Sequence, residues 1–160
     1  MIYVILIILF ALMQALLLGR IHIFGVVSPL LYVYFALLFP RGYSRWMQMV
    51  LCFVMGLAVD MFENTPGLAS ASMTLIAFLQ PGVFELFLKK EDKADLRPGI
   101  NTMGFSKFLT YVFMLVFLYC IVFFSLEAFT NIDWMEWLIS IGGSTLLTVI
   151  TILIIDSVRR

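Results

Sequence analysis

Charge is scarce in this 160-residue sequence: only 12% of its residues are Asp, Glu, Lys or Arg, and the net charge is zero. A typical soluble domain is about a quarter charged and about half apolar. In this chain 63% of residues are hydrophobic and the mean hydropathy is +1.08. A water-soluble fold of this length could not bury so much apolar surface, so we expect a lipid bilayer to be the solvent for most side chains. The balanced charge also provides no field that would attract nucleic acid.

Metal ligands and nucleophiles are also sparse. Cys52 and Cys120 lie in separate apolar stretches and form no CxxC pair. The single histidine, His22, has no Cys, Asp or Glu close to it in sequence, whereas a metal site needs several ligands. No glycine-rich phosphate loop, nucleophile elbow or zinc-protease signature occurs. We therefore predict no metal, no cofactor and no catalytic residues, and we do not expect an enzyme.

Six hydrophobic segments predict one all-α polytopic membrane domain over residues 1–160. A spanning helix needs about 20 mostly apolar residues. The predicted transmembrane segments are residues 2–18, 26–39, 46–59, 68–88, 105–126 and 138–155. Their apolar runs are continuous rather than alternating, which favours helices over strands. The second to fourth segments are short or broken, the fourth by Gln80-Pro81-Gly82, so we expect some of them to tilt, kink or cross incompletely.

Lysine and arginine positions predict the orientation, because cytoplasmic loops carry an excess of both. With a cytoplasmic N-terminus and six crossings, nine of the ten basic residues lie on the cytoplasmic side and only Arg20 lies outside. The predicted outer loops carry acids instead, namely Asp60, Glu63, Glu127, Asp133 and Glu136. We therefore predict that both termini are cytoplasmic. Trp46, Trp134 and Trp137 lie near predicted helix ends and suit interfacial anchoring.

The junction between the third and fourth segments, from Gly56 to Ala71, is the most informative stretch. A carboxylate such as Asp60 at the end of an apolar run is costly unless it reaches water, a donor or a cation. Pro66 and Gly67 predict a tight turn before the next helix, and the small residues after them predict close packing. Two interpretations stay open. Either the loop shapes an outer binding surface, or Asp60 is a helix-end residue whose carboxylate caps the neighbouring turn.

The sixth segment carries hydroxyl groups at helical spacing on one face: Ser140, Ser144, Thr148 and Thr151. This pattern predicts a close-packing seam whose hydroxyls bond back to their own helix; the alternative is a polar pathway for a solute. Asp156 precedes Arg159 and Arg160 by three and four residues, which predicts an interfacial ion pair. Isolated amides are expected to form hydrogen bonds between helices: Gln14, Gln48 and Gln80.

The chain resembles the MreD family, small polytopic membrane proteins of the bacterial rod-shape-determining system. The resemblance lies in the length, the six hydrophobic segments and the sparse loops. It lies above all in the junction pattern Gly56-x-x-x-Asp60, followed after five residues by Pro66-Gly67-Leu68 and a helix of small residues. Pro29, which opens the second segment, also fits the family.

The resemblance implies a bacterial inner-membrane protein without enzymatic activity that binds MreC, a single-span protein with an extracytoplasmic domain. Through MreC it implies membership of the peptidoglycan elongation complex, together with MreB, RodA and a class B transpeptidase. The candidate partner-binding and structural loop then consists of Gly56, Asp60, Pro66 and Gly67.

The alternative function follows from the fold, since the resemblance also implies similarity to the S components of ECF vitamin importers. Under this alternative the chain is a small-molecule binding subunit of an importer. S-component-like chains often carry an Ala-x-x-x-Ala helix that docks their transporter subunit, and Ala11 and Ala15 match that pattern. The scarcity of polar groups that could line a ligand pocket weighs against the alternative.

Overall fold

The computed structural model describes residues 30–40, 42–88, 97–129 and 133–158, together with the single residues 5, 8, 9 and 12. Its helices, in chain order, are α2 (Val33–Leu37), α3 (Arg45–Glu63), α4 (Leu68–Phe87), α5 (Ile100–Met103), α6 (Phe105–Glu127) and α7 (Trp134–Val158). The first predicted segment lies outside the described residues, apart from the four single positions. So do Ala11, Gln14, Ala15, Arg20, His22 and Pro29.

Four of these helices, α3, α4, α6 and α7, are long and apolar enough to cross a membrane. They contain 19, 20, 23 and 25 residues. At about 1.5 Å of rise per residue these lengths match a hydrocarbon core about 30 Å thick. The four helices confirm the third to sixth predicted segments, with ends displaced by a few residues. The chain is therefore an all-helical, multi-pass membrane protein.

The expected interruption of the fourth segment at Gln80-Pro81-Gly82 is wrong, because α4 continues through Pro81 to Phe87. A proline removes one backbone donor and crowds the preceding turn, but neighbouring helices can hold such a turn in place. Here the Gln80 side chain, next to the proline, is held by hydrogen bonds to α3 and α6. The helix continues through the proline, and these bonds hold the residue beside it.

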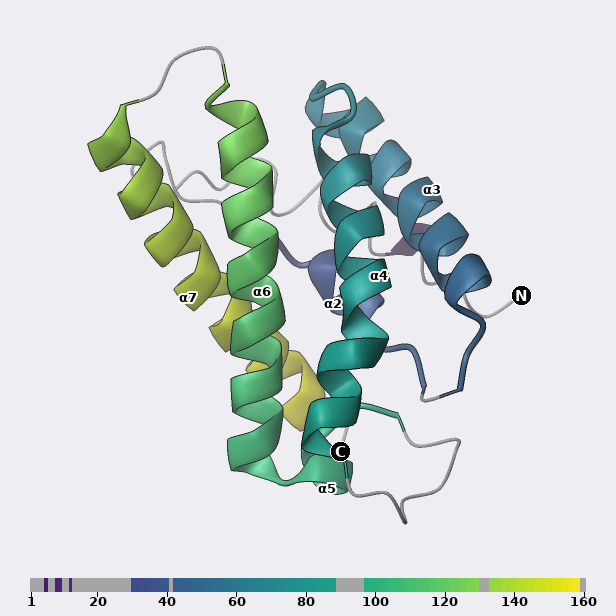
Figure 1. Cartoon of the computed structure of the whole chain (residues 1–160). Helices are drawn as coiled ribbons and strands as arrows, with labels where there is room; N and C mark the ends of the chain where they lie inside the picture. Colours follow the sequence, from purple (N-terminus) through teal and green to yellow (C-terminus); the bar gives the residue numbers. More distant parts are fainter. Residues whose placement is uncertain are drawn as a thin grey trace.

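The short helix α2 lies inside the bundle, behind α4 and α6 in the view of Figure 1. Residues 30–37 are between 0 and 2% exposed. In the described part of the second predicted segment only these five residues, Val33–Leu37, are helical, a length of about 8 Å. Backbone outside a spanning helix is tolerated at membrane depth where protein surrounds it. Over its described residues the second segment is therefore a short helix buried within the protein, and not a full spanning helix exposed to lipid.

The two ends of the bundle differ in the charged residues that they carry. At one end lie the α3–α4 turn and the α6–α7 connection, with the acids Glu63, Glu127, Asp133 and Glu136. At the opposite end lie the start of α3, helix α5 and the end of α7, with the cations Arg45, Arg97 and Lys107 and the acids Glu85 and Asp156. We call these the acidic end and the basic end. The separation matches the charge pattern from which the orientation is predicted.

Candidate functional site

The candidate loop forms what we call the Asp60 corner, residues 56–71 at the acidic end. The Asp60 side chain is only 6% exposed. Its Oδ1 accepts hydrogen bonds from the Ala69 backbone N–H at 2.9 Å and from Thr65 Oγ1 at 3.1 Å, and its Oδ2 accepts one from the Ser70 N–H at 3.0 Å. Ala69 and Ser70 are the second and third residues of α4, whose N–H groups have no partner within the helix. Asp60 therefore caps α4 from the neighbouring helix.

This cap replaces one that α4 lacks, since its own N-cap residue is Gly67, which has no side chain. The first N–H groups of a helix form its positive end, and a carboxylate placed there is stabilised by the helix dipole as well as by the hydrogen bonds. Among the described residues no cation forms an ion pair with Asp60. This geometry supports a structural role, in which the carboxylate holds α3 and α4 in a fixed arrangement.

The turn between the two helices has the predicted form. Asn64 ends α3 in the left-handed conformation, with φ 57°, which asparagine tolerates better than most residues. The Leu68 N–H then donates to the Thr65 carbonyl at 3.4 Å. Gly67 is the third residue of this turn, with φ 86° and ψ −9°, as a type II turn requires, and Pro66 holds the second position. Pro66 and Gly67 therefore form the tight turn expected from the sequence.

Close packing behind the turn depends on Gly56, which lies one helical turn before Asp60 on the same face of α3. A Cβ at Gly56 would lie 2.4 Å from the Ser70 Cα and 2.8 Å from the Ala69 carbonyl oxygen. Both are backbone atoms that cannot move aside without separating the helices. A Cβ at Gly67, in contrast, would meet nothing within 4 Å. The small residues of α4 allow the close packing that was predicted. The position that has no room for a side chain is Gly56, on α3.

Of the two interpretations of Asp60, the structure shows the capping one. The carboxylate is buried and its oxygens bind the neighbouring turn. What the corner exposes is its tip, which consists of most of the turn 64–67 and, in the last turn of α3, of Met61 and Phe62, 84% and 59% exposed. A role of this loop in binding a partner remains a prediction, and any such contact falls on the tip residues and not on Asp60 itself.

The hydroxyl face of α7 is a packing seam in the described structure. Ser140 Oγ donates to the Glu136 carbonyl, and Thr151 Oγ1 donates to the Leu147 carbonyl, both at 2.7 Å, as expected for hydroxyls that bond back to their own helix. Thr148 differs, because its Oγ1 accepts a hydrogen bond from the Leu30 N–H at 3.1 Å. This bond anchors the chain that leads into α2.

Hydrogen bonds between helices join two of the three predicted amides, Gln48 and Gln80, to a tyrosine that was not predicted. Gln48 Nε2 donates to Gln80 Oε1, and Gln80 Nε2 donates to the Tyr111 hydroxyl, both at 2.8 Å. A second buried pair joins the Tyr32 and Tyr119 hydroxyls. Tyr111 and Tyr119 are eight residues apart and therefore share a face of α6. Two tyrosines at this spacing within an apolar run are the signal that could have indicated a polar network.

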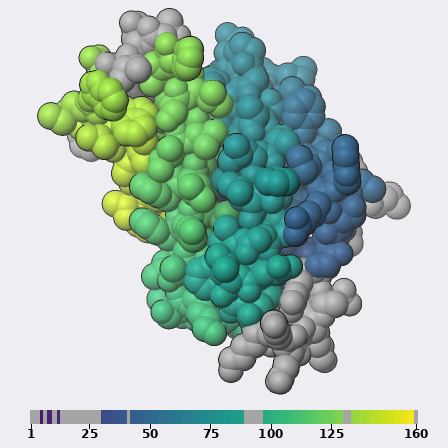
Figure 2. All heavy atoms as spheres, viewed as in Figure 1, coloured from purple at the N-terminus to yellow at the C-terminus, as the bar shows by residue number. Residues whose placement is uncertain are grey.

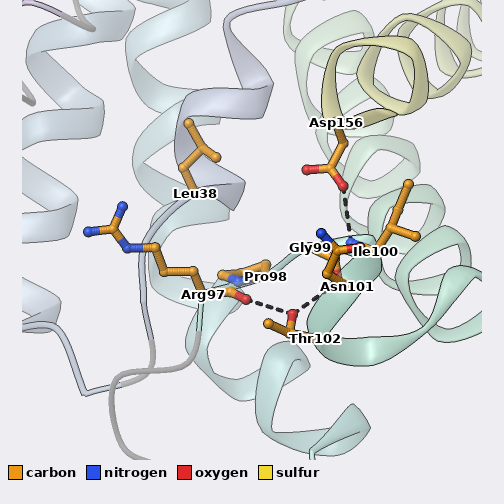
Figure 3. Close-up of a pocket in the computed structure, with 8 residues that line it drawn as sticks. All are labelled: Leu38, Arg97, Pro98, Gly99, Ile100, Asn101, Thr102 and Asp156. Atoms are coloured by element: carbon orange, nitrogen blue, oxygen red, sulfur yellow. Dashed lines mark hydrogen bonds between the residues drawn. The ribbon is translucent and has the colours of Figure 1, made fainter. Parts of the chain in front are cut away.

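Asp156 occupies a second structured site, at the basic end. Its Oδ1 accepts a hydrogen bond from the Tyr34 hydroxyl and its Oδ2 accepts one from the Ile100 N–H, each at 3.0 Å. The expected ion pair involves Arg159 and Arg160, which lie outside the described residues. Beside the carboxylate is a shallow hollow of about 180 Å³, shown in Figure 3.

Within the described ranges, no group of three or more His, Cys, Asp and Glu side chains lies close enough together to hold a metal ion.

Comparisons with protein-family models, curated proteins and solved structures give no match to this chain. The MreD resemblance therefore rests on the segment pattern and on the residues of the Asp60 corner.

Proposed function

We propose that this chain is a non-catalytic, MreD-like component of the bacterial rod-shape and peptidoglycan elongation complex, and that it binds an MreC-like single-span partner in the inner membrane. The observation that supports this proposal is the Asp60 corner. Gly56, Asp60, Pro66 and Gly67, the residues that carry the resemblance, serve one structural purpose, because they lock α3 to α4 and set the turn between them. A pattern with a shared purpose is stronger support than four separate matches.

In this proposal the corner acts by presenting a fixed surface to the partner. The acidic end faces the extracytoplasmic side, where the larger domain of an MreC-like protein lies. Met61 and Phe62 project from the tip while Asp60 and Gly56 hold the backbone beneath them. A tip that is already ordered loses little conformational entropy when the partner binds, so more of the contact energy appears as affinity. MreB, RodA and the class B transpeptidase associate through the partner.

Co-purification from membranes with a tagged MreC-like partner tests the proposal. We expect the double substitution Met61→Ala and Phe62→Ala to lose partner recovery at normal membrane expression, because it removes the exposed apolar tip. Met47→Ala is the matched control: Met47 lies on the same helix near the basic end and is 53% exposed. Full recovery of the partner by the double variant, or no recovery by the unsubstituted chain, would contradict the proposal.

The predicted orientation is tested separately by cysteine labelling of intact cells. A chain without Cys52 and Cys120 receives a single cysteine at Asn64, in the α3–α4 turn. We expect an impermeant reagent to label it, and protection from the reagent would place the acidic end in the cytoplasm. The importer alternative has its own readout in native mass spectrometry, where a stoichiometric vitamin-sized adduct that survives detergent exchange would favour it.

A further inference from the structure

The hollow at the basic end lies where three parts of the chain meet: the end of α2, the segment 97–102 and the last turns of α7. Its volume of about 180 Å³ is below the range of about 300–1,000 Å³ typical of sites for drug-sized ligands, so it suits a small polar group. Figure 3 shows Leu38 and Pro98 on its apolar side and the Asp156 carboxylate on the opposite side. The hollow therefore combines an apolar wall with a charged one.

Asp156 retains the capacity to bind a cation. It is half-buried, and its two hydrogen bonds come from neutral donors, the Tyr34 hydroxyl and the Ile100 N–H. Each carboxylate oxygen has a second lone-pair site for a further donor. No ion pair to Asp156 is formed by the described residues. A small ammonium group with N–H donors can occupy these remaining sites.

Gly99 leaves room for such a group. A Cβ at this position would lie 4.0 Å from each Asp156 carboxylate oxygen and 3.8 Å from Thr102 Oγ1, so the absence of a side chain keeps the space in front of the carboxylate open. The backbone of Gly99 is extended, with φ −179°, so alanine is sterically acceptable here. The opening next to the carboxylate can therefore be narrowed without changing its charge.

Arg97 supplies the opposite charge at the rim of the hollow. Its carbonyl oxygen accepts a hydrogen bond from Thr102 Oγ1 at 2.8 Å, which fixes the backbone, while its side chain is exposed. In Figure 3 the guanidinium extends away from Asp156, and these two described side chains form no ion pair with each other. A guanidinium is well suited to bind phosphate oxygens.

We propose that this hollow binds the headgroup of a phosphatidylethanolamine lipid, with its primary ammonium at Asp156 and its phosphate at Arg97. Both charges of the headgroup then meet the opposite charge, and the acyl chains continue along the apolar helices. Phosphatidylcholine fits less well because its trimethylammonium has no N–H to donate, and phosphatidylglycerol lacks a cation. The site is independent of the proposed partner binding, which lies at the opposite end of the bundle.

Native mass spectrometry of the full-length protein with an equal mixture of the three lipids, all with the same acyl chains, tests the proposal. We expect phosphatidylethanolamine to be bound in preference to phosphatidylglycerol. Asp156→Asn should reduce that preference by about fivefold, the effect of a partly exposed ion pair, and Asp156→Glu should restore most of it. Arg97→Gln should weaken all three lipids because each has a phosphate. Arg45→Gln, at the same end but outside the hollow, is the matched control and should change nothing.

Gly99→Ala separates lipid binding from folding, because it narrows the space while Asp156 keeps its charge and its hydrogen bonds. We expect it to lower phosphatidylethanolamine binding at an unchanged unfolding temperature. An unchanged lipid preference in both Asp156→Asn and Gly99→Ala would overturn the proposal and leave Asp156 a purely structural residue. Displacement of the lipid by equimolar soluble phosphoethanolamine would also overturn it, by assigning the site to a soluble compound.

Discussion

The two ends of the bundle use a carboxylate in the same way but in different surroundings. At the acidic end Asp60 is 6% exposed and its oxygens accept backbone hydrogen bonds from residues nine and ten positions later. At the basic end Asp156 is half-buried and its donors lie 56 and 122 positions earlier. Asp60 therefore closes a local corner between two consecutive helices, whereas Asp156 joins three segments that are distant in sequence.

This difference shows how one residue type serves two purposes in a membrane protein. A buried carboxylate whose oxygens bind the start of a helix contributes rigidity, and it leaves little surface for a ligand. A half-buried carboxylate beside an open hollow contributes less to rigidity and can still bind a cation. Figure 2 shows α3, α4 and α6 side by side on one face of the molecule, joining the two ends. We expect substitutions at the acidic end to cost more stability than those at the basic end.

The largest effect is expected from Gly56→Ala. The added Cβ would lie 2.4 Å from the Ser70 Cα, so α3 and α4 have to separate, and we expect a loss of about 3 kcal/mol in the free energy of unfolding. Gly82→Ala is the control, because Gly82 lies inside α4 with nothing within 4 Å of its added Cβ. It should be neutral or stabilising by up to about 1 kcal/mol. Denaturant unfolding in detergent measures the stability of both variants. Equal losses for Gly56→Ala and Gly82→Ala would mean that α3 and α4 are not closely packed at Gly56.

Asp60→Asn should have the next largest effect. In asparagine one of the two accepting oxygens becomes an NH2 donor, so the Ala69 or Ser70 N–H group would face a donor in place of its acceptor. We expect a loss of about 2 kcal/mol, in the range for hydrogen bonds to a charged, buried acceptor. Glu136→Gln, exposed at the same end, is the comparison and should change stability little. A loss at Asp60 no larger than at Glu136 would show that the corner does not depend on its carboxylate.

Gly67→Ala tests the turn apart from the packing. Its φ of 86° is unfavourable for a residue with a Cβ, although the space around it is open, so we expect a loss of about 1 kcal/mol. Gly67→Asn should lose less, because asparagine tolerates the left-handed region. Gly142→Ala, in open space within α7, should lose nothing. If Gly67→Asn is as unstable as Gly67→Ala, crowding instead of backbone conformation is the cause.

The smallest effect is expected at the basic end, from Tyr34→Phe. This change removes the hydroxyl that donates to Asp156, and water can replace it because the carboxylate is half-buried. We expect a loss of about 0.5 kcal/mol. A double-mutant cycle with Asp156→Asn isolates the interaction, since the second substitution should cost less when the first is already present. A loss as large as that of Asp60→Asn would remove the contrast between the two ends.

Features whose groups lie close together in the sequence were predictable, whereas features formed by groups far apart in the sequence were not. The Asp60 corner was readable because its carboxylate, its turn residues and its small residues lie within sixteen consecutive positions. The α4 break was predicted from local residues alone, whereas the groups that bind Gln80, next to Pro81, come from α3 and α6. The tyrosine pair is formed across 87 positions, and no local pattern specifies such a contact.

The sequence by itself determined that this is a helical membrane protein, where its long helices lie and how its charges are distributed, because bilayer thickness and the solvation of apolar side chains act on each segment separately. It also determined the tight turn, since Pro66 and Gly67 restrict their own backbone. Only the tertiary structure decided that α2 is buried as a short helix, that Asp60 caps α4 while Asp156 joins distant segments, and that Gly56 is the crowded glycine. These outcomes depend on which groups meet when helices pack, and packing brings together residues whose separation along the chain places no constraint on their separation in space.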